Sequence, residues 1–267
     1  MLKQRIITGA VGVPIIIFAI WFATPWFTVL LALTTLAGAF EFYRMGNLDR
    51  KEPLTYFGLL LALALLLSPH YNSIYTLSIV VTAIVFISLI WLLHLKPNKE
   101  TFRNWAWMMT GAIYVGWMLS YWLSLRGLDD GRIWVYLAVL TIFANDTGAF
   151  FIGRSMGKHK LAPAISPAKT WEGAIGGLVS AILGAIIIVL ILNHFYPFVF
   201  KYWQIVLLGF LVSLFAQLGD LVESLLKRNM GTKESGYLLP GHGGILDRFD
   251  SLIFVGPVIY YFVFFAL

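Results

Sequence analysis

The chain has 267 residues and no cysteine; 60% of the residues are hydrophobic and only 12% are charged. Soluble domains carry about 25% charged residues, so this composition excludes an ordinary soluble protein, and the lack of cysteine excludes disulfides and thiolate chemistry. The net charge of +6 is attributed to cytoplasmic loops rather than to a nucleic-acid partner, because Lys and Arg concentrate in such loops.

Nine apolar stretches follow one another along the chain. They cover residues 6–23, 25–43, 54–69, 73–94, 104–125, 132–152, 172–193, 203–226 and 246–266. A helix needs about 20 apolar residues to cross a bilayer, so the sequence predicts an all-α, polytopic integral membrane bundle of about nine transmembrane helices. We expect one membrane domain over residues 1–267, in which residues 1–130 form a scaffold or dimer part and residues 131–267 carry the catalytic motifs.

Loop charge predicts the topology of these spans. The basic N-terminus before an apolar run resembles a signal peptide, but more spans follow and no small-residue cleavage site stands out, so we take this run as the first span. Of the 19 Lys and Arg residues, all but Arg126, Arg132 and Lys201 lie at the N-terminus or in alternate loops. The positive-inside rule therefore predicts a cytoplasmic N-terminus, an external C-terminus, and cytoplasmic loops at 153–171 and 227–245.

Three polar residues lie within or at the end of apolar spans. Glu41, near the inner end of the second span, is expected to be an interfacial residue. Asn145 and Asp146 lie inside the sixth span, where a carboxylate rarely faces lipid. Metal ligation, contact with a ribose or base, and structural pairing all remain open for these two residues.

The segment that leads into the seventh span carries polar side chains suited to phosphate. Ser166 begins a Ser-Pro turn, and Lys169 and Thr170 lie at the expected start of a helix, followed by Glu172. Phosphates bind readily at helix N-termini. The alternative is an ordinary cap between a loop and a helix.

One face of the eighth span is polar. Gln217, Asp220, Ser224 and Lys227 lie at i, i+3, i+7 and i+10, a spacing that places them on the same side of a helix. Glu223 adds a carboxylate nearby. The alternative to a functional site is an internal Asp–Lys or Glu–Lys pair that stabilises helix packing.

The segment before the last span combines glycines, a histidine and two carboxylates. Asp247 and Asp250 are three residues apart and face the same way, so they can hold Mg²⁺ and leave positions for phosphate oxygens. Gly243 and Gly244 permit a tight turn against a ligand. The alternative is an N-capping aspartate after a glycine turn; His242 could donate to phosphate, act as a base or make a structural contact.

These segments together resemble the phosphatidate cytidylyltransferase (CDP-diacylglycerol synthase) family. The positions that match its long signature are Ser224, Leu226, Lys227, Arg228, Lys233, Gly236, Leu239, Pro240, His242, Gly243, Gly244, Asp247, Arg248 and Asp250. Glu234 departs from the pattern, because the family has Asp there, so we assign no metal ligation to it. The segment from Ser166 to Gly173 resembles a second stretch of the family.

The resemblance implies that CTP and phosphatidic acid react to give CDP-diacylglycerol and pyrophosphate, with Mg²⁺ and a second, monovalent cation such as K⁺. It also implies a homodimer among membrane lipids of a bacterial inner membrane, with the site facing the cytoplasm. Phosphoryl transfer of this kind needs positioning and charge neutralisation rather than a side-chain nucleophile.

Roles can then be assigned to the candidate residues. The expected metal ligands are Asp220, Asp247 and Asp250. The expected phosphate ligands are Lys227, Arg228, Lys233 and Arg248, assisted by Lys169 and His242. The other expected substrate-binding residues are Asn145, Asp146, Ser166, Thr170, Glu172, Ser224, Gly243 and Gly244.

Two other functions stay open. A related CTP-dependent enzyme, such as a polyprenol kinase or an archaeal CDP-lipid synthase, would use similar chemistry on another lipid or isoprenoid. An ion-coupled transporter could also place acidic and basic side chains in the membrane, although inverted repeats and broken helices are more typical of that class.

Overall fold

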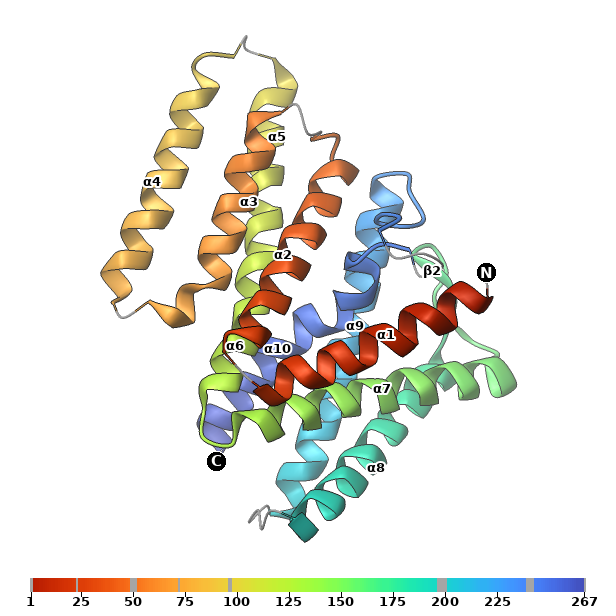
Figure 1. Ribbon diagram of the computed structural model, residues 1–267. Helices are drawn as coiled ribbons and strands as arrows, with labels where there is room; N and C mark the ends of the chain where they lie inside the picture. The colour runs from red at the N-terminus through yellow and green to blue at the C-terminus, as the bar shows by residue number, and fades with distance from the viewer. Residues whose placement is uncertain are drawn as a thin grey trace. The chain divides into compact units, whose positions relative to one another are not determined.

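The computed structural model describes residues 2–22, 24–48, 52–71, 73–95, 98–195, 201–238 and 243–266. These residues are almost entirely α-helical (Figure 1). The helices are α1 (Leu2–Phe22), α2 (Trp26–Met45), α3 (Pro53–Leu66), α4 (Ile74–Leu92), α5 (Lys99–Gly111), α6 (Met118–Gly127), α7 (Gly131–Met156), α8 (Trp171–Phe195), α9 (Tyr202–Asn229) and α10 (Leu246–Ala266), with short turns η1 (Ser68–His70) and η2 (Ala112–Trp117).

The nine expected spans are confirmed as helical segments within the described residues. The span expected at 104–125 is built from α5, the π-helical turn η2 and α6 in succession. Among the residues that the structure describes, six helices are long and apolar enough to cross a membrane, and two shorter apolar helices cover Thr8–Phe22 and Pro53–Leu66. The chain is therefore a multi-pass membrane protein built as a helical bundle.

The chain divides into two compact units, which are described separately. Unit 1 comprises Met1–Ser124 and Met230–Phe249, and unit 2 comprises Leu125–Asn229 and Asp250–Leu267. The expectation of a single membrane domain stays a prediction.

Aromatic packing in unit 1 holds α2 against α5. The ring of Trp107 stacks on Phe42 with centroids 4.4 Å apart, and its indole N–H donates to the Phe42 carbonyl at 3.0 Å. The hydroxyl of Tyr43 donates to the Met108 carbonyl at 3.1 Å. Gly116 of η2 lies so close to the backbone of Ala62 in α3 that a Cβ would collide with it.

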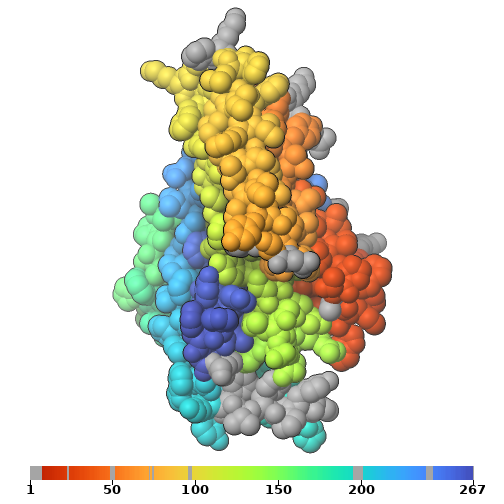
Figure 2. All heavy atoms as spheres, turned by 90° about the vertical axis from the view of Figure 1, so that its left-hand side faces the viewer, coloured from red at the N-terminus to blue at the C-terminus, as the bar shows by residue number. Residues whose placement is uncertain are grey.

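Helix α4 forms an apolar outer face of unit 1, where Figure 2 shows it in orange and yellow. It contacts α3 and α5, and it exposes Tyr75, Ile79, Phe86, Ile87 and Ile90. An apolar face of this extent is expected of a helix that meets lipid chains rather than water.

Unit 2 is organised around close packing of α7 against α8 (Figure 1). Gly153 of α7 and Gly173 of α8 face each other, and a Cβ on Gly148 would collide with Ser180. Small residues allow membrane helices to approach closely. The expected cytoplasmic loop at 153–171 contains a β-hairpin, in which β1 (Lys160–Ala162) pairs antiparallel with β2 (Ser166–Thr170) directly before α8.

Candidate active site

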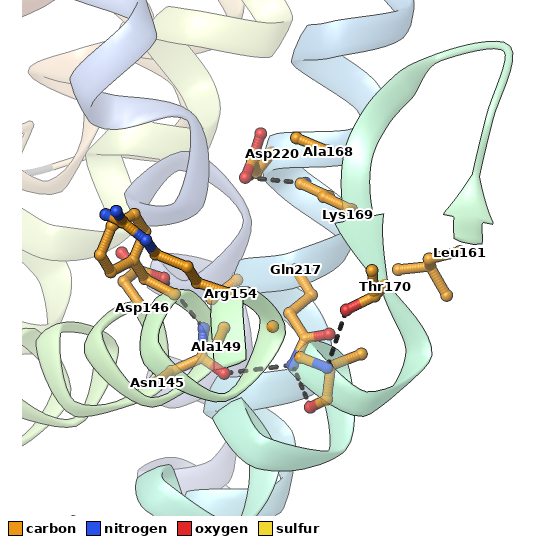
Figure 3. Close-up of a pocket in the computed structure, with 15 residues that line it drawn as sticks. Asn145, Asp146, Ala149, Arg154, Leu161, Ala168, Lys169, Thr170, Gln217 and Asp220 are labelled. Carbon is orange, nitrogen blue, oxygen red and sulfur yellow. Dashed lines mark hydrogen bonds and ion pairs between the residues drawn. The ribbon is translucent and has the colours of Figure 1, made fainter. Parts of the chain in front are cut away.

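A cavity of about 400 Å³ opens in unit 2 (Figure 3). Its walls come from α7, the β1–β2 hairpin, the first turn of α8 and the C-terminal half of α9. Four segments that lie apart in the sequence thus bring polar side chains to one place. Asp146, Lys169, Thr170 and Asp220, all predicted from the sequence as site residues, line this cavity together with Asn145.

An ion pair crosses the cavity between Lys169 of β2 and Asp220 of α9. Their charged atoms, Nζ and Oδ2, are 2.7 Å apart, and the side chains are 23% and 42% exposed. The Nζ atom of Lys169 is itself buried, whereas the Asp220 side chain is partly exposed to the cavity. An ammonium can bind a phosphate oxygen, and a carboxylate can bind a hydrated cation.

A network of amides and hydroxyls supports the floor of the cavity. Asn145 is only 1% exposed, and its Oδ1 accepts from Ser213 Oγ at 2.7 Å and from Gln217 Nε2 at 3.1 Å. Its Nδ2 donates to Asp146 Oδ1 at 2.9 Å, and Gln217 Nε2 also donates to the Ala174 carbonyl. Asn145 therefore makes the structural pairing that the sequence left open, and it orients Asp146 and Gln217.

Three carboxylates of unit 2 lie within electrostatic range of one another. The charges of Asp146 and Asp220 both act on Asp250, and Lys169 acts on Asp146. Close packing of α9 on α10 produces this approach, because Gly219 has no Cβ where the Asp250 carbonyl passes. Such an accumulation of negative charge favours a bound cation.

The fit of this acidic group to a metal can be tested from its donors. In the part of the chain that the structure describes, no three His, Asp or Glu side chains are grouped closely enough to hold a metal by themselves. Mg²⁺ commonly uses only one or two carboxylates and completes its shell with substrate phosphates and water. The acidic group therefore fits a metal that arrives with a nucleotide.

Thr170 and Glu172 hold the hairpin that carries Lys169. The Thr170 hydroxyl accepts from the Gly173 N–H at 3.1 Å and so caps the start of α8. The Glu172 carboxylate accepts from the Lys158 N–H at 3.0 Å and pairs with His159 Nδ1 at 2.6 Å. These contacts match the cap that the sequence left open as the alternative to phosphate binding, and they fix the position of Lys169.

The end of α9 carries three further predicted residues. Lys227 pairs with the fully buried Glu223 at 2.5 Å, which is the internal Glu–Lys pair that the sequence analysis named as an alternative. Arg228 Nε donates to the Ile165 carbonyl at 3.2 Å and ties α9 to the turn of the hairpin. Ser224 Oγ lies 3.4 Å from Asp220 Oδ1. Ser166, in β2, pairs with Ala162 in the hairpin.

In unit 1, residues 235–238 and 243–246, which we call the glycine-rich segment, surround Asp247. Its Oδ2 accepts from the Gly244 N–H at 2.9 Å and from the Ser235 N–H at 3.0 Å. Gly243 adopts φ +82°, a conformation that side chains disfavour, so the turn requires glycine there. Lys233 and Arg248 are exposed in the same unit. His242 lies outside the described residues.

Sequence reasoning missed Arg154, which also lines the cavity. In the sequence, Arg154 contributed only to the positive charge of a predicted cytoplasmic loop. However, Asp146, Phe150 and Arg154 follow one another at four-residue steps, so they share a face of α7. The Arg154 guanidinium carbon lies 6.0 Å from the centre of the Phe150 ring. Helical spacing from Asp146 was the signal that could have found it.

Comparison with known proteins places these features in a family context. Residues 3–266 match the model of the cytidylyltransferase family. A phosphatidate cytidylyltransferase of Bacillus subtilis (strain 168) is 38% identical over 264 residues, which cover 97% of each chain. Similar proteins of that name occur in Staphylococcus epidermidis, at 39% identity over 237 residues (87% of this chain and 86% of the relative), and in Staphylococcus haemolyticus, at 41% over 201 residues (74% and 75%).

Proposed function

The chain belongs to the cytidylyltransferase family and is a nucleotidyltransferase, and we propose that it transfers CMP from CTP to phosphatidic acid in phospholipid biosynthesis. The products are CDP-diacylglycerol and pyrophosphate. The observation that carries this proposal is the Lys169–Asp220 ion pair in the lining of a cavity of about 400 Å³, on a chain that matches the family over nearly its whole length.

The reaction needs no side-chain nucleophile. An oxygen of the lipid phosphate attacks the α-phosphorus of CTP, a new P–O bond forms, and the bond to the bridging oxygen of pyrophosphate breaks. Lys169 and Arg154, which line the same cavity, supply positive charge for the phosphates. The amide network around Asn145 keeps the floor of the cavity in place during turnover.

The acidic side chains of unit 2 support a proposed magnesium requirement. Asp220 and Asp250 would hold Mg²⁺, and Asp247 remains a predicted ligand on the first turn of α10. When bound, the metal neutralises charge on the nucleotide phosphates. A second, monovalent cation such as K⁺ is also part of the proposal, and Asp146, which lines the same cavity, is its candidate ligand.

The setting of the reaction is also part of the proposal. The distribution of Lys and Arg among the loops supports an active site that faces the cytoplasm, where CTP is available, in a bacterial inner membrane. The diacyl tails would stay in the bilayer while the lipid phosphate enters the cavity. We further propose that the enzyme acts as a homodimer.

Product identity tests the proposal. The purified protein in detergent micelles receives Mg²⁺ and CTP labelled at either the α- or the γ-phosphate, with phosphatidic acid or a polyprenol as acceptor. We expect the α-label in CDP-diacylglycerol and the γ-label in pyrophosphate. Transfer of the γ-label to the polyprenol would instead establish a kinase, and ion flux in liposomes without turnover would establish a transporter.

A further inference from the structure

Glu41 of α2 is a buried carboxylate that the proposed reaction does not use. Its side chain is 3% exposed, and three donors surround it. Ser235 Oγ donates to Oε2 at 3.0 Å, the Ile245 N–H donates to Oε1 at 3.1 Å, and the Leu246 N–H donates to Oε2 at 2.9 Å. Glu41 is therefore buried rather than interfacial as expected from the sequence, and all three of its partners lie in the glycine-rich segment at the far end of the chain.

These contacts make Glu41 a cap for α10 that comes from another helix. Leu246 is the first residue of α10, and the first N–H groups of a helix have no partner within it. A carboxylate is favoured at this end because the helix dipole is positive there. A buried carboxylate is costly unless it is hydrogen-bonded, so the three donors are what make its burial possible.

Two glycines let the segment pass over Glu41. A Cβ on Gly236 or on Gly244 would collide with the Glu41 carboxylate. A larger residue at either position would therefore push the segment away from α2. The backbone at Gly236 and the backbone at Gly244 therefore both follow the shape of the Glu41 carboxylate.

The same contacts hold Asp247. Ser235 Oγ, which donates to Glu41, also accepts from the Asp247 N–H at 3.3 Å. The Ser235 N–H and the Gly244 N–H both donate to Asp247 Oδ2. These two backbone donors to the Asp247 carboxylate therefore belong to residues that Glu41 binds or contacts closely.

We propose that Glu41 is a positioning residue, which holds the glycine-rich segment and the start of α10 so that the Asp247 carboxylate points in its working direction. This inference rests on the proposed function, because Asp247 is one of the predicted metal ligands. Glu41 does not touch substrate in this scheme and acts through its donors Ser235, Ile245 and Leu246.

The test uses Glu41→Gln, which keeps the size of the side chain but replaces one acceptor oxygen with an NH₂ group. Hydrogen–deuterium exchange of the full-length protein in micelles should quicken at Ile245 and Leu246 by about tenfold or more, as expected for loss of a charge-assisted hydrogen bond. The kcat should fall by about tenfold to a hundredfold, with the KM for phosphatidic acid nearly unchanged. The matched control is Glu52→Gln, since Glu52 is an exposed glutamate of the same unit that makes no side-chain cap on α3.

Two results with Glu41→Gln would overturn the inference. Exchange at Ile245 and Leu246 that matches the wild type would show that Glu41 does not hold the segment. Faster exchange with an unchanged kcat would make Glu41 a purely structural cap. If Glu41→Gln does not fold, Ser235→Ala replaces it. This variant removes the Oγ that joins Glu41 to the Asp247 N–H and leaves Glu41 both backbone donors. Its kcat should fall in the same way, and an unchanged kcat would overturn the inference. A wild-type protein that makes no CDP-diacylglycerol would instead refute the proposed function.

Discussion

Two predicted metal ligands, Asp220 in unit 2 and Asp247 in unit 1, are held by different means. Asp220 pairs with the end of the Lys169 side chain and is 42% exposed. Asp247 accepts two backbone N–H groups from a glycine-rich segment, which itself is fixed by Glu41. A lysine can swing away from a carboxylate when a ligand enters, whereas backbone donors move only if the segment moves. Asp220 is thus suited to exchange partners during turnover, and Asp247 is suited to remain still.

The largest expected effects come from removing these two charges. Asp220→Asn and Asp247→Asn should each lower kcat by about two to three orders of magnitude, because loss of a metal-binding charge removes several kcal/mol of transition-state stabilisation. Only Asp247→Asn should also quicken amide exchange at Ser235 and Gly244. Asp129→Asn, at an exposed position of unit 2, serves as the control and should leave the rate unchanged. A near wild-type rate in folded Asp220→Asn would refute its assignment.

The role of Lys169, the partner of Asp220, is tested by Lys169→Met. This change removes one charge-assisted contact to phosphate, so kcat/KM for CTP should fall by about tenfold to a hundredfold. Lys160→Met, in β1 of the same hairpin, is the matched control because Lys160 is exposed and does not line the cavity. Equal losses for the two variants, measured at saturating phosphatidic acid, would mean that general hairpin charge, rather than Lys169, binds the nucleotide.

A smaller effect is expected from Arg248→Lys, next to Asp247. Charge is kept, but the planar fork that binds two oxygens is lost, so kcat/KM for CTP should fall by about tenfold. Expression and membrane insertion should not change. Arg103→Lys, an exposed arginine of α5, should be silent in the same assay. If both variants are silent, Arg248 contributes only to topology.

The smallest functional effect is expected from topology probes, because the chain has no native cysteine. Single cysteines introduced as Asp129→Cys and Lys160→Cys flank α7 and should leave turnover intact. A membrane-impermeant maleimide should label position 160 from the cytoplasm and position 129 from outside. Labelling of both from the same side would contradict the proposed orientation.

The sequence predicted the spans because burial in lipid demands long apolar runs, and such runs are a local signal. It also located the polar segments that hold Asp146, Lys169, Asp220 and Asp247. What it could not show was which of these side chains meet. The Lys169–Asp220 pair joins residues that are neighbours only in three dimensions.

Glu41 shows most clearly why contacts between distant segments could not be predicted from the sequence. Its partner Leu246 is 205 positions away along the chain, and nothing near Glu41 in the sequence distinguishes an interfacial glutamate from a buried cap. The β1–β2 hairpin was missed for a similar reason, because its strands are too short to give a periodic pattern. Thr170 and Glu172 remain predicted substrate-binding residues, and their observed contacts also hold that hairpin.

The central claim is that the site works by positioning, with the lipid phosphate as the nucleophile and no covalent link between CMP and the protein. Exchange of labelled pyrophosphate into CTP, measured with and without phosphatidic acid, tests this claim most directly. We predict exchange only when phosphatidic acid is present, since reversal of the reaction then requires CDP-diacylglycerol on the enzyme. Exchange in the complete absence of lipid would reveal a CMP–enzyme intermediate and contradict the account.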